Sequence, residues 1–429
     1  MEPLVFSMTG TPALDAGEVG PKAANLAALA AAGLPVPDGF CVGARAYRAQ
    51  LAALAVQPSS LRATDDAALM RARREAIAIR LALLSRPIAA EILEPMLAAW
   101  RALCARSPGA ATVVRSSSLV EDRFGSSFAG QFESYLGLEN EADFLTAVRA
   151  CWAALWAPRI LRYMLDRDAN PADTAMAVLV QPLIAARVSG GGLSDTGAGD
   201  MMISATWGLG SAIAQGEVVP DRYVLSRSGE LRSSEAGRKS HAVGCRHHGG
   251  AGTQALGDGA ASALCLAAPR LTELAGYLQR AQQIMGRAVE IEWALDDRGF
   301  KLLQSRPLPL LPAHLPDASW LGHPAVRGQP AGVGWGTGRA CVVNCECELS
   351  RVGPGDVLVT KVAGPALGRI LPRVSAVVSE LGGSTSHLAS LARERGIPMV
   401  LGVHHATERI PDGRHVAVDG VAGIVRWMN

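Results

Sequence analysis

The chain has 429 residues, of which 49% are hydrophobic and 5% aromatic, and its formal net charge at pH 7 is +2. The length allows two or three domains with sizeable cores. The small net charge argues against nucleic acid or an anionic membrane as a partner, and the apolar stretches are too short to predict a membrane helix. Because the N-terminus lacks the pattern of a secretory signal, we expect a cytoplasmic protein.

The eight cysteines are scattered through the sequence, which is typical of buried, reduced thiols in a cytosolic protein. Cys341, Cys345 and Cys347 form one cluster. Their spacing is not that of a zinc-finger pair, and the nearby sequence offers no histidine ligand. We therefore expect these cysteines to pack rather than to bind a metal.

The first three hundred residues alternate between helical and strand-like segments, separated by glycine-rich turns. In chain order we predict a helix that follows Lys22 and ends at Gly33, helices over 68–105, strands at 111–117 and 175–184, a long loop or hairpin over 228–262, and a helix over about 270–286. Two further strands, 289–295 and 300–306, are joined by a turn that is typical of a hairpin.

A change in composition predicts a domain boundary. Five prolines lie between Pro307 and Pro324, a density that disfavours both helix and sheet and favours a semi-stiff extended spacer. We therefore expect one domain over 1–306, a linker over 307–325, and a compact, β-rich domain with one clear helix over 326–429.

The segment over 375–403 is the most informative one. A strand leads into Gly382 and Gly383, and the apolar pattern that follows predicts a helix with His387 in its first turn. The free amides and the dipole of a helix N-terminus favour a bound anion. Thr385 and Ser386 can cap the helix and donate hydrogen bonds to phosphate. From these residues alone, an ordinary surface histidine remains the alternative.

The pattern Gly-Gly-Ser-Thr-Ser-His at 382–387, followed by Ala-Arg-Glu and Gly-Ile-Pro at 392–398, resembles the phosphohistidine motif of the phosphoenolpyruvate synthase and pyruvate phosphate dikinase family. The segments 354–361 and 412–425 fit the same domain. The resemblance implies that His387 carries a phosphoryl group and that Thr385 assists it.

Four earlier segments resemble the ATP-grasp part of this family, in the family's order. They are 19–40, 113–138, 176–184 and 289–307, and they carry the expected nucleotide-binding residues Lys22, Arg115, Ser127, Gly130, Gln181, Glu292, Gln304 and Arg306. Taken singly, each residue has a simpler explanation as a solvated charge or an ordinary strand residue. The implied fold class is α+β, an ATP-grasp domain followed by a small β/β/α swivelling phosphohistidine domain.

Each residue type suits its implied role. Lys22 and Arg115 can neutralise triphosphate oxygens, and a lid containing Ser127 and Gly130 can close over phosphates with its backbone N–H groups. Gln181 suits the hinge where adenine sits. Glu292 and Gln304 offer oxygen ligands to Mg²⁺, a cation that binds few protein ligands.

Arg306 shares a strand face with Gln304 and can stabilise the transferring charge. The segment 205–227 matches a further glycine-rich family motif with one departure. Where the family has Glu after Gly-Leu-Gly, this chain has Ser211. Glu217 is a candidate substitute for that carboxylate.

The resemblance implies a two-stage reaction. The β-phosphoryl group of ATP passes to His387, with AMP and phosphate released, and then to a small-molecule acceptor. We expect this chain by itself to lack the C-terminal barrel that holds phosphoenolpyruvate or pyruvate, and also the helical antibiotic-binding domain of the related rifampin phosphotransferase. The acceptor is therefore not identified.

Three alternatives stay open at this point. The chain could be a ligase or condensing enzyme that activates a substrate by phosphorylation. It could be one subunit of a split system, resembling phenylphosphate synthase or a divided phosphoenolpyruvate synthase, with the acceptor site on a separate subunit. It could also be a non-catalytic nucleotide sensor.

Overall fold

The structure is a computed structural model that describes residues 3–9, 14–55, 66–121, 132, 134–165, 170–246, 250–310 and 318–428. Two compact units divide the chain between them. The first comprises Met1–Ile184, Cys245–Gly252 and Lys301–Arg306, and the second comprises Ala185–Gly244, Thr253–Phe300 and Pro307–Asn429. Among the described residues, no helix combines the length and the apolar character needed to cross a membrane.

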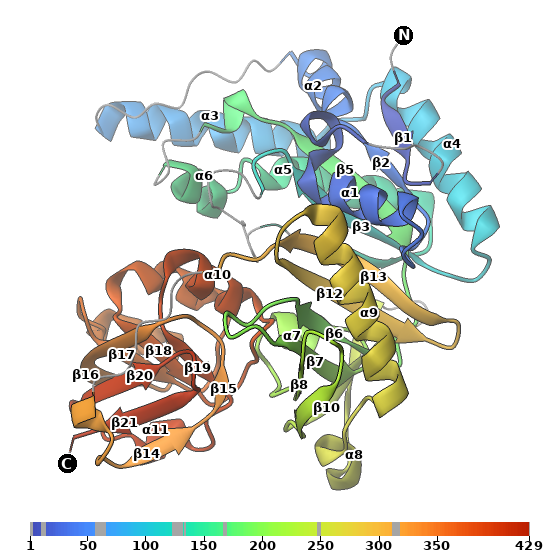
Figure 1. Cartoon of the computed structure of the whole chain (residues 1–429). Helices are drawn as coiled ribbons and strands as arrows, with labels where there is room; N and C mark the ends of the chain where they lie inside the picture. Colours follow the sequence, from blue (N-terminus) through green and yellow to red (C-terminus); the bar gives the residue numbers. More distant parts are fainter. Residues whose placement is uncertain are drawn as a thin grey trace. The chain divides into compact units, whose positions relative to one another are not determined.

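The first unit is built on a five-stranded sheet with the order β1-β2-β5-β3-β4 (Figure 1). Its strands are β1 (Val5–Ser7), β2 (Phe40–Val42), β3 (Thr112–Ser118), β4 (Ser134–Leu138) and β5 (Met176–Pro182), and its helices are α1 (Ala16–Ala31), α2 (Ala44–Ala53), α3 (Asp66–Ser85), α4 (Ala90–Arg106), α5 (Glu141–Ala154) and α6 (Pro158–Leu165). The central strands β3 and β5 are buried along nearly their whole length, as their apolar runs require.

Helices cover both faces of this sheet. On one face, the Ser117 hydroxyl of β3 donates a hydrogen bond to the Val19 carbonyl of α1 at 2.7 Å. On the other, the ring of Phe40, which pairs with Val180 of β5, packs edge-on against Phe144 of α5. Because side chains alternate along a strand, the odd-numbered residues of β3 face α1 and the even-numbered residues face α5.

A kink at Gly20 brings α1 close to β3. Gly20 has φ 76° and ψ 157°, and Pro21 then opens the second helical segment, where its missing N–H costs no hydrogen bond. A Cβ atom at Gly20 would lie 2.4 Å from the Ser117 carbonyl oxygen, so glycine is needed for this approach. Lys22 therefore stands in the first turn of a helical segment beside β3.

A six-stranded sheet has the order β13-β12-β6-β7-β8-β9, and all of its strands belong to the second unit except β13, whose residues Lys301–Arg306 belong to the first. The strands are β6 (Val188–Leu193), β7 (Met201–Trp207), β8 (Asp221–Leu225), β9 (Leu231–Glu235), β12 (Val289–Asp296) and β13 (Gly299–Pro307), and the helices of this part are α7 (Ser211–Ala214), α8 (Asp258–Ser262) and α9 (Ala268–Met285). The strands β10 (His241–Arg246) and β11 (Gly250–Ala255) form a separate two-stranded sheet.

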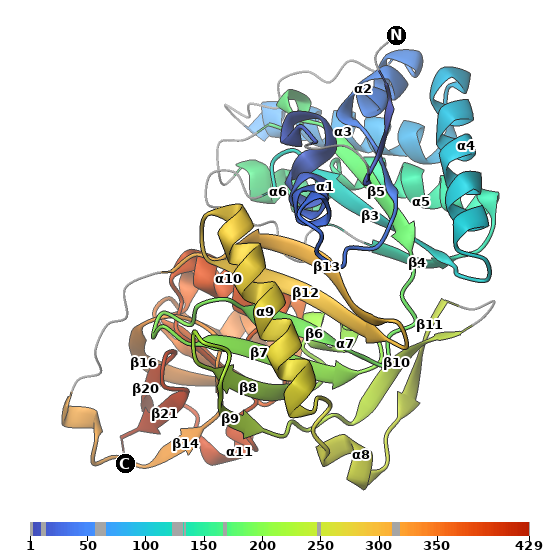
Figure 2. The ribbon, with the colours of Figure 1, turned by 45° about the vertical axis from the view of Figure 1, so that its right-hand side comes forward.

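Helix α9 lies across one face of the six-stranded sheet (Figure 2). A Cβ atom on Gly192 of β6 would lie 3.0 Å from the Leu278 side chain of α9 and 3.4 Å from that of Ile291. Trp293 packs edge-on against Phe300 on the same side. The residues of β12 that alternate with these, Glu290 and Glu292, therefore face the opposite side of the sheet.

The C-terminal part of the second unit is an eight-stranded sheet with the order β14-β21-β20-β16-β17-β18-β19-β15. Its elements are β14 (Ala325–Arg327), β15 (Gln329–Pro330), β16 (Trp335–Val343), β17 (Val357–Thr360), β18 (Ala376–Ser379), α10 (His387–Arg395), β19 (Met399–Leu401), α11 (Ala406–Arg409), β20 (His415–Asp419) and β21 (Ile424–Trp427). The strands β16 to β19 are parallel neighbours, and α10 connects β18 to β19.

The structure confirms most predicted elements. The helices after Lys22 and over 68–105, the strands β3 and β5, and the hairpin β12–β13 are all present. Helix α9 ends at Gly286, which has a left-handed conformation. The region over 228–262 is more regular than a loop, because it contains β9, the β10–β11 pair and α8. Part of the predicted linker, 311–317, lies outside the described residues, so that boundary stays a prediction.

One cysteine prediction was wrong. Cys345 and Cys347 are exposed and joined by a disulfide, not buried and reduced. Their Cα atoms are 5.3 Å apart, within the range that a disulfide can bridge. Cys41, Cys151 and Cys341 are buried and are not disulfide-bonded, as expected.

Candidate active site

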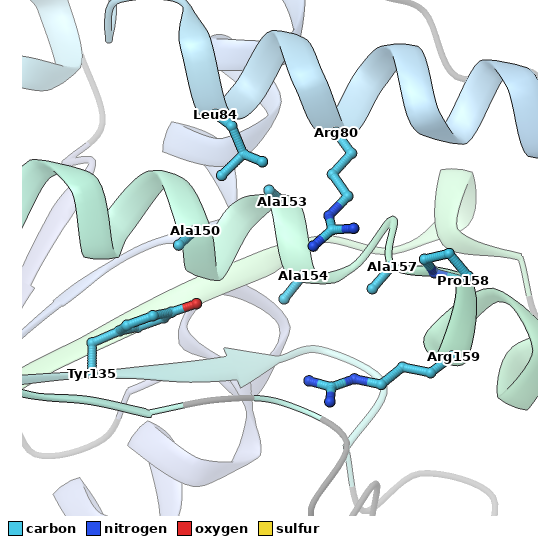
Figure 3. Close-up of a pocket in the computed structure, with 9 residues that line it drawn as sticks. All are labelled: Arg80, Leu84, Tyr135, Ala150, Ala153, Ala154, Ala157, Pro158 and Arg159. Atoms are coloured by element: carbon cyan, nitrogen blue, oxygen red, sulfur yellow. The ribbon is translucent and has the colours of Figure 1, made fainter.

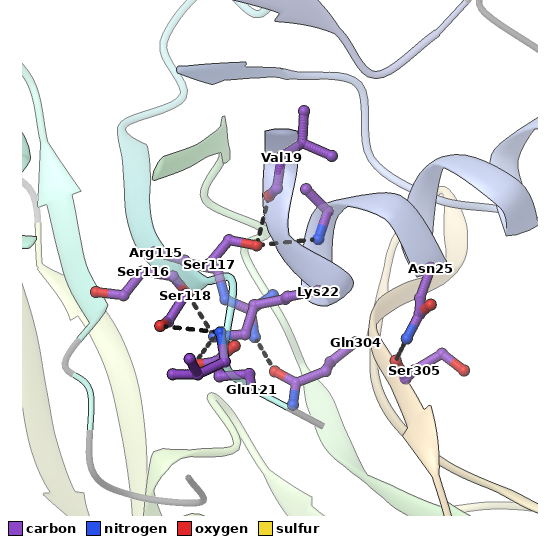
Figure 4. Close-up of polar contacts among 12 residues, drawn as sticks. Val19, Lys22, Asn25, Arg115, Ser116, Ser117, Ser118, Glu121, Gln304 and Ser305 are labelled. Carbon is purple, nitrogen blue, oxygen red and sulfur yellow. Dashed lines mark hydrogen bonds and ion pairs between the residues drawn. The ribbon is translucent and has the colours of Figure 1, made fainter. Parts of the chain in front are cut away.

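The first unit gathers cations and amides beside β3 (Figure 4). The Lys22 ammonium group donates a hydrogen bond to the Ser116 carbonyl at 2.5 Å and forms an ion pair with Glu121 at 3.4 Å. The Lys22 side chain is 13% exposed and that of Glu121 is 7% exposed. Glu121, which the sequence analysis missed, thus neutralises Lys22 in this state.

Arg115 joins β3 to the middle of β13. Its guanidinium group donates hydrogen bonds to the Leu303 carbonyl and, at 2.8 Å, to the Gln304 side-chain oxygen. The Asn25 amide of α1 donates to the Ser305 carbonyl at 3.0 Å. The structure therefore brings together the predicted residues Lys22, Arg115 and Gln304 in one region of the first unit.

Gln181 lies near the end of β5 and is 2% exposed. It pairs with Val113 of β3, so it shares the α1 face of the sheet with Arg115. Its side-chain amide donates a hydrogen bond to the Pro37 carbonyl at 3.0 Å, which ties β5 to the segment before β2.

Two predicted positions, Ser127 and Gly130, lie outside the described residues. Arg306 is 7% exposed and stands two residues after Gln304 on β13, so both side chains lie on the same face of the strand. Arg306 is therefore buried on the strand face that it shares with Gln304 and is not a solvated surface charge.

In the second unit, His387 is the first residue of α10, as predicted. Ser386 is the N-cap residue, and its hydroxyl accepts a hydrogen bond from the Ala389 N–H at 3.3 Å. Gly396 ends the helix in a left-handed conformation. The half-buried imidazole thus stands beside the free amides of a helix N-terminus that follows the carboxyl end of a parallel strand.

Thr385 contacts the six-stranded sheet. Its hydroxyl lies 2.5 Å from that of Ser204 on β7, and a Cβ atom on Gly191 of β6 would lie 2.6 Å from its side chain. Gly191 pairs with Ser204 on one side and with Glu292 on the other. Thr385 therefore reaches the sheet directly beside Glu292. These two predicted site residues are 93 positions apart in sequence.

A second contact lies one helical turn along α10. The Ser390 hydroxyl donates to the Glu290 carboxylate at 3.0 Å, and the Arg393 guanidinium group donates to it at 2.9 Å. The Arg393 and Glu290 side chains are each 6% exposed, so this ion pair is buried. Glu290 and Glu292 are two residues apart on β12 and therefore share one face of the strand. This spacing was visible in the sequence, but the sequence analysis did not use it.

These two contacts fix the place of His387. Thr385 lies against Gly191, which pairs with Glu292, and Ser390 donates a hydrogen bond to Glu290. His387 lies between Thr385 and Ser390 in the sequence, so its helix N-terminus is held over the sheet face that carries both carboxylates. This arrangement brings the predicted phosphoryl carrier to the sheet face that carries a predicted metal ligand.

Ser211 stands where the family motif has a glutamate, and the structure shows the surroundings of this residue. The Ser211 hydroxyl is buried and, among the described residues, has no hydrogen-bond partner. Glu217 is partly exposed, and its carboxylate lies 3.3 Å from the His241 ring of β10. Glu217 is thus engaged with His241 at the surface, which does not support it as a substitute for the family carboxylate.

Within the described ranges, no group of three or more His, Cys, Asp or Glu residues has the arrangement of a metal site. Glu292 and Gln304 carry oxygen donors, the kind of ligand that Mg²⁺ takes.

Comparison with known proteins identifies the family of this chain. Residues 16–317 match the family described as "Pyruvate phosphate dikinase, AMP/ATP-binding domain", and residues 352–423 match "PEP-utilising enzyme, mobile domain". The chain is 31% identical to phosphoenolpyruvate synthase of Pyrococcus furiosus, over 95% of this chain and 56% of that protein.

Two probable phosphoenolpyruvate synthases are similarly related. The protein of Methanothermobacter thermautotrophicus is 31% identical over 96% of this chain and 61% of its own length, and that of Archaeoglobus fulgidus is 32% identical over 95% and 56%. The chain thus spans little more than half the length of these relatives. Because the family match covers most of its residues, the chain belongs to the pyruvate phosphate dikinase family of AMP/ATP-binding domains.

Proposed function

We propose that this chain is an ATP-dependent phosphotransferase of the dikinase type, with an ATP-grasp domain and a swivelling phosphohistidine domain. ATP donates its β-phosphoryl group to His387, which passes it to a small-molecule acceptor. The observation that carries the proposal is the placement of the α10 N-terminus over the sheet face that bears Glu292. The acceptor is bound in this chain or on a separate subunit.

In the first stage, an imidazole nitrogen of His387 attacks the β-phosphorus of ATP. A nitrogen–phosphorus bond forms, and the bond from that phosphorus to the oxygen of AMP breaks. Water then cleaves the β–γ linkage and releases inorganic phosphate. In the second stage, an acceptor oxygen attacks the remaining phosphoryl group, which restores the free imidazole.

The residues of this chain position the reactants. Lys22, Arg115 and Arg306 neutralise phosphate oxygens, and Gln181 borders the adenine. Glu292 and Gln304 would hold Mg²⁺, which would supply positive charge to offset the charge that develops on the phosphates. Thr385, beside His387, donates a hydrogen bond to the transferring group. The segment that contains Ser127 and Gly130 supplies backbone N–H groups to the phosphates.

Labelling with ATP that carries radioactive phosphorus at the β or the γ position tests this function. We expect acid-labile label from the β position and formation of AMP with the native chain and with His404→Ala, an exposed nearby histidine. His387→Ala should retain no label. Label from the γ position together with ADP would contradict the dikinase assignment, and label retained by His387→Ala would contradict the role of His387.

A further inference from the structure

A pocket of about 360 Å³ lies within the first unit, on residues that the proposed function does not use (Figure 3). Its walls come from α3 and from three consecutive elements later in the chain, namely β4, α5 and the start of α6. The described residues that line it are Arg80, Leu84, Tyr135, Ala150, Ala153, Ala154, Ala157, Pro158 and Arg159.

Three hydrogen-bond donors converge in this pocket. Figure 3 shows the guanidinium groups of Arg80 and Arg159 and the hydroxyl of Tyr135 directed toward one another across the alanine wall. Arg80 comes from α3, Arg159 from the first turn of α6, and Tyr135 from β4. Two planar guanidinium groups in one cavity suit the bidentate recognition of a carboxylate or a phosphate.

The rest of the wall is small and apolar. The methyl groups of Ala153, Ala154 and Ala157 are buried, and none of the described lining residues is acidic. The pocket volume falls within the range of small-molecule sites and exceeds what an isolated phosphate ion fills. The space is therefore suited to an anionic head group that is attached to an organic body.

This pocket is separate from the nucleotide residues. Tyr135 pairs with Val114, an even-numbered residue of β3, so its side chain lies on the α5 face of the sheet. Arg115 is the next residue along β3 and points to the α1 face, as does Gln181. The sheet itself therefore stands between the pocket and these two predicted nucleotide ligands.

We propose that this pocket is a second anion site, which binds a small organic phosphate or carboxylate. Arg80 and Arg159 hold the head group from two sides, and the Tyr135 hydroxyl donates a third hydrogen bond. The alanine methyl groups contact the organic body. Ligand binding here requires no contribution from the His387 reaction.

The test is calorimetric titration of the full chain at constant ionic strength. Glycerol 3-phosphate, glycerate and glycerol share one organic body and differ only in the head group. A Lys22→Met background weakens the nucleotide cluster, so that binding there is not mistaken for binding in the pocket. We expect one or both anions to bind and glycerol not to bind. The anion that binds with the higher affinity identifies the preferred head group.

Variants then locate the site. Arg80→Gln combined with Arg159→Gln should weaken anion binding by roughly tenfold or more, since hydrogen bonds to charged groups are strong. Tyr135→Phe keeps the ring and should weaken binding several-fold. The control is Arg71→Gln, because Arg71 is exposed on α3 nine residues before Arg80, which places it on the opposite side of the helix.

Three results would overturn the proposal. They are the absence of binding by both anions, binding that survives the double arginine substitution, and binding that disappears with Lys22→Met alone. The last result would assign the anion to the nucleotide cluster instead. Both arginine side chains are exposed, so the double variant is expected to fold, and an unchanged thermal unfolding midpoint verifies this.

Discussion

The Arg393 guanidinium group and the Glu290 carboxylate form a buried ion pair 2.9 Å apart, and this pair joins α10 to the six-stranded sheet. Arg393 also donates to the Ala331 and Ser384 carbonyls, so one side chain organises the start of α10 as well as its contact with the sheet. Ser390 adds a hydroxyl to the same carboxylate. The position of His387 over this sheet depends on these interactions.

Glu290→Ala should slow the labelling of His387 from ATP and destabilise the second unit. Removing one partner leaves a buried charge uncompensated, which typically costs about 3–5 kcal/mol. Stopped-time labelling and chemical denaturation measure the two effects. The matched control is Asp297→Ala. The side chains of Asp297 and of its ion-pair partner Arg187 are each 72% exposed, so this pair should contribute less than about 1 kcal/mol. Equal effects of the two substitutions would contradict a special role for the buried pair.

The contact between Gly191 and Thr385 predicts a size-dependent effect. Gly191→Ala places a Cβ atom 2.6 Å from Thr385 and should displace the start of α10, which lowers the rate of His387 labelling. Thr385→Gly in the same chain should recover part of the rate lost through the clash, so the two substitutions should be non-additive. Gly257→Ala is the control, because a Cβ atom there meets nothing within 4 Å. Strict additivity would show that the clash is not the cause.

The Lys22–Glu121 pair predicts opposite effects on nucleotide affinity. Lys22→Met removes the cation that we propose to contact phosphate oxygens, so the dissociation constant for ATP should rise. Glu121→Gln removes the carboxylate that neutralises Lys22, so the dissociation constant should fall. Effects of about tenfold correspond to about 1.4 kcal/mol each. Equilibrium titration with ATP measures both, and weaker binding by Glu121→Gln would mean that Glu121 orients Lys22 rather than competing with phosphate.

A second buried ion pair is a stability determinant. Lys239 and Asp221 are both fully buried and contact each other, and Asp221 also accepts hydrogen bonds from the Gly237 and Cys265 N–H groups. Lys239→Met should lower the free energy of unfolding by about 3–5 kcal/mol. Denaturant titration tests this, with Arg232→Met as the exposed control. A loss below 1 kcal/mol would contradict the prediction.

Sequence patterns predicted the elements and the local position of His387 well. The glycine turn, the capping serine and the apolar spacing after His387 are local signals, and local signals determine where a helix begins and ends. The same holds for the β12–β13 hairpin and for α9 with its terminal Gly286. The strands over 228–262 carry few apolar residues and much glycine and serine, so their periodicity gave no clear signal.

The partners of the site residues were not predictable in the same way. Lys22 meets Glu121 and Arg115 meets Gln304 only because sheet pairing and the Gly20 kink bring distant segments together. The pocket at Arg80 is a further example, since its walls come from four elements. Pairwise side-chain contacts of this kind depend on tertiary packing, which propensity and spacing do not encode.

Strand β3 presents side chains to both faces of its sheet, because Arg115 points to one side and the neighbouring Val114 to the other. A side-chain period of two means that deleting one residue before Arg115 would exchange the two faces along the rest of the strand. The arginine would then point toward α5, and Ser116 would take its place beside Lys22. Substitutions at single positions of β3 should therefore be far better tolerated than any change in its length.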